Sequence, residues 1–102
     1  MQKAGVVGAG IGGIATAIRL AVKGYQVTVF EANAYPGGKL SSWEAAGYRF
    51  DAGPSLFTMP QFVDELFTLA GKSSQAYFEY QKMPEVCRYF WEDGTRFVVP
   101  AN

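Results

Sequence analysis

The sequence contains no histidine and a single cysteine, Cys87, among its 102 residues. One cysteine cannot form an internal disulfide, and without histidine the chain can build neither a Cys–His zinc cluster nor a histidine-based catalytic triad. The sequence also has no excess of positive or negative charge, because nine Lys and Arg residues balance nine Asp and Glu residues. This balance indicates no general attraction to nucleic acid or anionic lipid. We therefore expect no bound metal and no nucleic-acid partner.

Long apolar runs are also missing. The apolar stretch after Met1 is short and interrupted by glycines, so it is typical neither of a signal peptide nor of a membrane span. This pattern predicts a cytoplasmic location. The length suits one small domain, whereas an enzyme that binds a cofactor and a separate substrate usually needs two larger ones. We therefore expect the chain to be the N-terminal part of a longer protein.

The first third of the chain has the pattern of a βαβ unit. Residues 4–7 form an apolar run that ends in a glycine cluster, which predicts a buried parallel strand. Residues 12–23 show helical periodicity, with Arg19 left for solvent, and Gly24 is placed to end the helix. Residues 26–31 read as a second buried strand. The fold class expected is α/β and Rossmann-like.

Antiparallel pairs and one more helix are expected downstream. The sequence 58–61 has the spacing of a capping box, with Pro60 in the first turn and Gly71 placed to end the helix. Its apolar face is expected to include Phe62, Leu66 and Leu69. Two hairpins are expected, residues 40–43 with 48–51 around 44–47, and residues 88–91 with 95–99 around 93–94.

The glycines that follow the first strand form a Gly8-x-Gly10-x-x-Gly13 pattern, and Glu31 closes the second strand eighteen positions later. A strand before, a helix after and an acid at this distance are the context of a dinucleotide-binding fingerprint. In it, Gly8 permits the tight turn, Gly10 leaves room for a pyrophosphate, and Gly13 lets the helix pack on the strand. The alternative, in which the glycines only make a turn, fits the agreement of spacing and context less well.

Glu31 favours one class of dinucleotide. Its carboxylate can accept hydrogen bonds from ribose hydroxyls, whereas it would repel a 2′-phosphate, so NADP is disfavoured. The phosphates would meet the unpaired N–H groups and the positive dipole end of the helix. FAD and NAD share the ADP half, and the fingerprint does not choose between them.

A second glycine pair follows the acid, in the sequence AYPGGK at residues 34–39. Gly37, Gly38 and the cation Lys39 resemble the second signature of the flavin-containing amine oxidase superfamily, which implies FAD. Lys39 departs from the commoner arginine, which keeps the charge but loses bidentate geometry. An ordinary glycine turn with a solvated lysine is the alternative.

The segment YRFDAGPSLFTMP, residues 48–60, resembles the corresponding segment of the phytoene desaturase family of carotenoid desaturases. The likeness extends from residue 3 to about 71. It implies that Gly53 and Pro54 lie near the cofactor, Gly53 to allow close approach. For Asp51, a cofactor contact and a turn or capping role remain open.

This resemblance implies an FAD-dependent oxidoreductase that desaturates a linear isoprenoid, such as phytoene or a related carotenoid precursor, by hydride transfer to flavin. It implies residues 1–72 as the N-terminal part of the FAD-binding domain and residues 73–102 as the beginning of an antiparallel-sheet substrate domain. Peripheral contact with the inner face of the membrane is implied for the full protein. No catalytic residue is identified. The alternatives are an amine or protoporphyrinogen oxidase of the same fold, or an NAD-binding module, and the isolated 102 residues are expected to be inactive.

Overall fold

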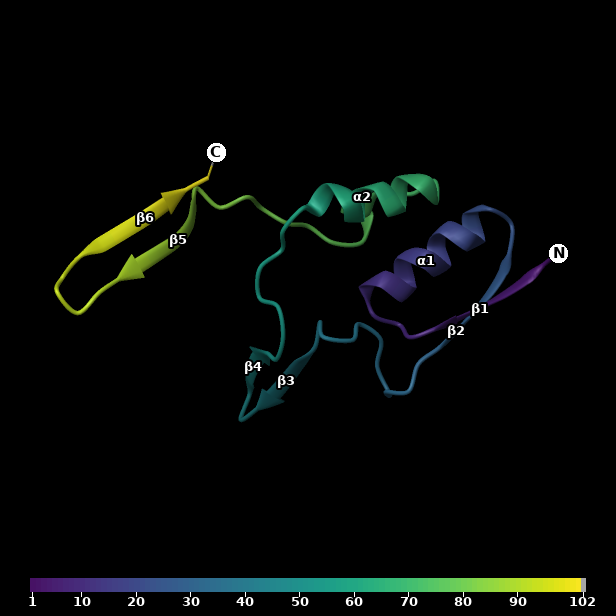
Figure 1. Ribbon diagram of the computed structural model, residues 1–102, viewed down its shortest axis with the longest axis horizontal. Coiled ribbons are helices and arrows are strands. Elements are labelled where there is room, and N and C mark those ends of the chain that lie inside the picture. The colour runs from purple at the N-terminus through teal and green to yellow at the C-terminus, as the bar shows by residue number, and fades with distance from the viewer. Residues whose placement is uncertain (102) are drawn as a thin grey trace.

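The computed structural model describes residues 1–101 and begins with the expected βαβ unit. Strand β1 (Lys3–Val7) pairs in parallel with β2 (Gln26–Phe30), in a register that runs from Lys3 opposite Gln26 to Val7 opposite Phe30. Helix α1 (Ile11–Val22) connects them and packs on both strands. Figure 1 shows this unit at the N-terminal end of an elongated chain. The predicted Rossmann-like α/β start is confirmed.

Both helices end as their glycines predict. After α1, the N–H of Gly24 donates to the carbonyl of Ala21 (3.0 Å), and the N–H of Tyr25 donates to the carbonyl of Leu20 (3.1 Å). This pair of bonds is a Schellman motif, which satisfies the last carbonyls of a helix. Helix α2 (Pro60–Leu69) ends with the same pair of bonds around Gly71.

The predicted capping box at the start of α2 is wrong. Met59 is the N-cap, in a left-handed conformation with φ 53°, and no side chain caps the helix. The reason is Pro60, whose fixed φ suits the first helical position and whose missing N–H costs nothing there. The residue before Pro60 therefore becomes the N-cap, one position later than the box requires.

The described strands form three separate two-stranded sheets. The first hairpin pairs β3 (Ser42–Ala45) with β4 (Tyr48–Asp51), and Trp43 stacks on Phe50 with ring centroids 4.5 Å apart. Its turn is only residues 46–47, shorter than the predicted 44–47, because Glu44 already pairs with Arg49. The second hairpin pairs β5 (Glu85–Phe90) with β6 (Arg96–Pro100). It extends away from the other elements (Figure 1).

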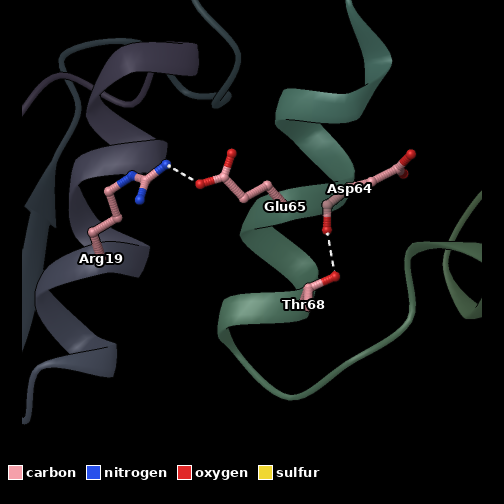
Figure 2. A network of polar contacts seen from close by, with 4 residues as sticks. All are labelled: Arg19, Asp64, Glu65 and Thr68. Atoms are coloured by element: carbon pink, nitrogen blue, oxygen red, sulfur yellow. Dashed lines mark hydrogen bonds and ion pairs between the residues drawn. The ribbon is translucent and has the colours of Figure 1, made fainter.

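Helix α2 packs against α1, and an ion pair joins the two helices. A guanidinium nitrogen of Arg19 lies 3.3 Å from a carboxylate oxygen of Glu65, as Figure 2 shows. Arg19 was predicted to face solvent, and the ion pair with Glu65 was not predicted. Both side chains are about half exposed, and such pairs contribute roughly 0.2–1 kcal/mol. Of the residues on the predicted apolar face of α2, Leu66 is buried, whereas Phe62 and Leu69 are exposed.

The segment after α2 folds back onto that helix. The carboxylate of Asp64 accepts a hydrogen bond from the hydroxyl of Ser74, in the short 3-10 helix η1 (Ser74–Ala76), and another from the hydroxyl of Tyr80, both at 2.6 Å. The ring of Phe67 lies 5.1 Å from that of Tyr77, centroid to centroid. Ser74, Tyr77 and Tyr80 thus contact α2. The predicted domain division after residue 72 stays a prediction.

The core of the described residues is very small. Its buried apolar side chains are Val6, Ala9 and Leu66. The radius of gyration is 18.2 Å, against roughly 13 Å for a compact domain of this length. The prediction that β1 and β2 are buried strands is wrong here, since Val7 is 89% exposed and Phe30 is 58% exposed. Among the described elements, α1 alone packs on this sheet.

No helix within residues 1–101 combines the length and apolar character that crossing a bilayer would require.

Candidate dinucleotide-binding site

The glycine loop lies between the end of β1 and the start of α1. Gly8 has φ +100°, a conformation that side chains disfavour, and its N–H donates to the carbonyl of Phe30 at 2.7 Å. The chain then turns into α1, with Gly10 as the N-cap. The tight strand-to-helix turn predicted for Gly8 is therefore present.

Gly13 and Gly10 are required for different reasons. A Cβ added at Gly13 would lie 1.9 Å from the carbonyl oxygen of Gly8, so only glycine allows the helix to come this close to the loop. A Cβ added at Gly10 would meet no atom within 4 Å, and the φ of Gly10 is an ordinary −75°. The fold thus explains Gly13 but gives no reason for glycine at position 10. Space reserved for a ligand does give one.

Ala9, between these glycines, is buried and held at both ends of its backbone. Its N–H donates to Oε1 of Glu31 at 2.8 Å, and its carbonyl accepts from the N–H of Gly37 at 2.7 Å. The other oxygen of Glu31 accepts from the N–H of Asn33 at 2.8 Å. The hydrogen bonds from Asn33 and then Ala9 hold the pKa of the Glu31 carboxyl below its ordinary value. Glu31 therefore carries its charge at neutral pH.

The second glycine pair lies against the first glycine loop. A Cβ added at Gly38 would approach the Cα of Gly10 to 3.3 Å. One added at Gly37 would lie 2.7 Å from the carbonyl oxygen of Leu40. The structure thus brings the two glycine signatures together, although they lie nearly thirty positions apart in the sequence.

Gly53 also packs against backbone, next to the second pair. A Cβ there would lie 1.8 Å from the carbonyl oxygen of Lys39, so this glycine is explained by close packing within the chain. The side chains of Lys39 and Pro54 are exposed. Asp51 ends β4, with a carboxylate oxygen 4.0 Å from a guanidinium nitrogen of Arg49. Contact of Lys39, Gly53 and Pro54 with a cofactor stays a prediction.

The electrostatics of the loop suit an anion. The first turn of α1 contains no acidic residue and no side chain caps it, so the positive end of the helix dipole and the first N–H groups remain available to a phosphate. Each Glu31 oxygen accepts one backbone bond and can still accept another, for example from a ribose hydroxyl. Within residues 1–101, no group of three His, Cys, Asp or Glu side chains is arranged to hold a metal ion. The site is therefore built for a nucleotide with phosphates.

Two contacts at the site were not expected from the sequence. Ala9 occupies a variable position of the fingerprint, and Asn33 lies in a loop, so neither carries a signal of its own. Their N–H groups are nevertheless the partners of Glu31. Backbone groups act here, and any residue type except proline could supply them.

These features define a dinucleotide-binding protein of the Rossmann type, and the chain belongs to the NAD(P)-binding Rossmann-like domain family, whose sequence model matches residues 6–72. It is 55% identical over 102 residues to a 1-hydroxycarotenoid 3,4-desaturase from Flavobacterium sp. (strain P99-3), covering all of this chain and 21% of that protein.

A second relative is a 4,4'-diaponeurosporene oxygenase from Staphylococcus aureus (strain Mu50 / ATCC 700699). Identity is 42% over 90 residues, which are 88% of this chain and 18% of the relative. The chain thus spans about a fifth of the length of the curated relatives it matches. The predicted resemblance to carotenoid desaturases is confirmed.

Proposed function

We propose that residues 1–102 bind the ADP half of FAD in a flavin-dependent oxidoreductase. The observation that carries this proposal is the arrangement of Ala9, held between Glu31 and Gly37 so that Gly10 stays open at the start of α1. In this role the N–H groups of the first turn bind the pyrophosphate and Glu31 binds the ribose. FAD, when bound, supplies the acceptor for a hydride from the substrate.

FAD is preferred over a nicotinamide dinucleotide because of the second glycine pair. Gly38 approaches Gly10, which places further close-packed backbone beside the expected phosphate position. The resemblance of residues 37–39 to the flavin signature supports the same choice. Glu31 would repel the 2′-phosphate of NADP at close range. These arguments together favour FAD.

We propose that the substrate of the full-length protein is a linear apolar isoprenoid of the carotenoid precursor type, which loses a hydride and a neighbouring proton to form a double bond. The name of the first relative, a desaturase, supports this reaction, and the names of both relatives support a substrate of this class. Residues of this chain would bind and orient the cofactor, and the residue that accepts the proton is not assigned. A cytoplasmic location, with peripheral contact at the inner face of the membrane, is part of the same proposal.

The visible spectrum of the purified full-length protein tests the cofactor. We expect flavin absorption and about one FAD per chain in the natural protein, and loss of both in Gly10→Val. A colourless protein that binds NADH and no FAD would contradict the proposal.

A panel of substrates tests the reaction. The flavin-loaded protein is incubated with carotenoid precursors, amines and protoporphyrinogen, and the products are separated by chromatography. We expect new conjugated double bonds in the carotenoid precursors alone. Oxidation of an amine or of protoporphyrinogen, with the carotenoids unchanged, would refute the assigned substrate class while leaving the FAD site intact.

A further inference from the structure

Glu31 makes bonds within the protein that a residue devoted to ribose would not need. Its carboxylate joins the buried Ala9 to Asn33, each through a 2.8 Å bond from a backbone N–H. Bonds from N–H groups to a carboxylate are charge-assisted and stronger than neutral ones. The side chain therefore connects the end of β2 with the loop that follows β1.

The loop needs this connection because regular structure does not hold it. Ala9 lies outside both β1 and α1. Its N–H is bound by Glu31 and its carbonyl by Gly37, so the peptides on both sides of Ala9 are fixed in orientation. The peptide bound by Gly37 leads directly into Gly10, the N-cap of α1, and the peptide bound by Glu31 immediately precedes it. Loss of the Glu31 bond would leave a buried N–H without its partner and free the loop to move.

We infer that Glu31 is a positioning residue for the phosphate-binding loop, in addition to any bond it makes to the ribose. This inference rests on the proposed function of the site. Glu31 holds Ala9 in place, and Ala9 in turn sets the direction of the chain at Gly10. The loop therefore has its binding conformation before the pyrophosphate binds. Such preorganisation lowers the ordering cost of binding. Substitution of Glu31 should therefore weaken binding of the phosphates even where no ribose hydroxyl is present.

The test uses ADP and 2′,3′-dideoxy-ADP, which lacks both ribose hydroxyls. Their dissociation constants are measured by calorimetry on the cofactor-depleted full-length protein, as natural protein, Glu31→Ala and Glu31→Gln. We expect Glu31→Ala to raise the dissociation constant of dideoxy-ADP about tenfold or more, since a buried N–H loses a charged partner. We expect the dissociation constant for Glu31→Gln to lie between those of the natural protein and Glu31→Ala. The amide oxygen of the glutamine can accept a hydrogen bond from one N–H, while its NH₂ group faces the other.

Glu79→Ala is the matched control, since it removes an exposed carboxylate from the segment after η1 and should change neither dissociation constant. Hydrogen exchange without ligand adds a local readout, and the amides of Ala9 and Gly10 should exchange faster in Glu31→Gln while those of α2 do not. Circular dichroism checks the fold, and if Glu31→Ala does not fold, Glu31→Gln decides.

The outcomes separate the two proposals. Unchanged affinity for dideoxy-ADP in the folded Glu31 variants, with weaker binding of ADP, would overturn the positioning role and leave a ribose ligand. A natural protein that binds neither nucleotide would contradict the proposed function itself, and the positioning role with it. Weaker binding of both nucleotides in the variants supports both the proposed nucleotide site and the positioning role of Glu31.

Discussion

The contact between Gly13 and the glycine loop gives the sharpest prediction, which concerns Gly13→Ala. The added Cβ would lie 1.9 Å from the carbonyl oxygen of Gly8 and 2.9 Å from its carbonyl carbon. Both groups are backbone, so α1 would have to move away from the glycine loop by more than about 1 Å to restore ordinary contact. Overpacking of this kind costs about 1–3 kcal/mol.

Gly12→Ala is the matched control, because the neighbouring position in the same turn has no atom within 4 Å of an added Cβ. Both substitutions gain about 1 kcal/mol of helix propensity, which cancels when the two variants are compared. We therefore expect Gly13→Ala to be less stable than Gly12→Ala by the full cost of overpacking.

Urea unfolding and hydrogen exchange of the α1 amides measure this difference, and exchange reports on α1 even where other parts of the protein unfold separately. Equal protection of α1 in the two variants would refute the reasoning, because it would mean that the helix does not rest on the loop as described.

Three further predictions follow from the same contacts. Gly10→Ala should keep the melting temperature of the cofactor-depleted protein but lose FAD, since its Cβ meets only open space in the protein; normal FAD content would contradict this. Because hydrogen bonds lower the pKa of Glu31, protection of the Ala9 amide should be complete above the ordinary glutamate value of about 4.3, fall as pH drops through the lowered pKa, and lose this dependence in Glu31→Gln. The bond to Asp64 raises the pKa of Tyr80, so Asp64→Asn should lower it in a spectrophotometric titration, and an unchanged titration would show that the bond does not form in solution.

Local features of the fold could be predicted from the sequence. The βαβ unit, both hairpins and the helix stops at Gly24 and Gly71 depend on neighbouring residues and on backbone preferences that particular residue types carry. The start of α2 was misplaced for the same kind of reason. Two local signals competed there, and Pro60 prevailed over the capping box.

Features that depend on distant residues could not be predicted. The glycine fingerprint indicated a ligand role for Glu31, but not that its carboxylate also holds Ala9, twenty-two positions away. The resemblance indicated cofactor contact for Gly53, whereas the structure shows its closest approach to be the carbonyl of Lys39. Sequence patterns state which residue types a site requires, and three-dimensional packing decides which atoms meet.

The exposure of strands β1 and β2 also could not be predicted from the sequence. The apolar character of β1 predicts burial, yet Val7 is 89% exposed. Burial needs a covering layer, and the described residues supply one on the α1 side. An apolar strand sequence therefore indicates that the strand is suited to burial. It does not indicate which segment covers the strand.

The most direct test of the central claim is a crystal structure of the natural full-length protein with its cofactor bound. We predict FAD with its pyrophosphate beside Gly10 and Gly38 at the start of α1. Its adenosine ribose should lie within hydrogen-bonding distance of Glu31, which still accepts a hydrogen bond from the N–H of Ala9. A pyrophosphate bound away from this loop, or a Glu31 side chain turned away from both the ribose and Ala9, would contradict it.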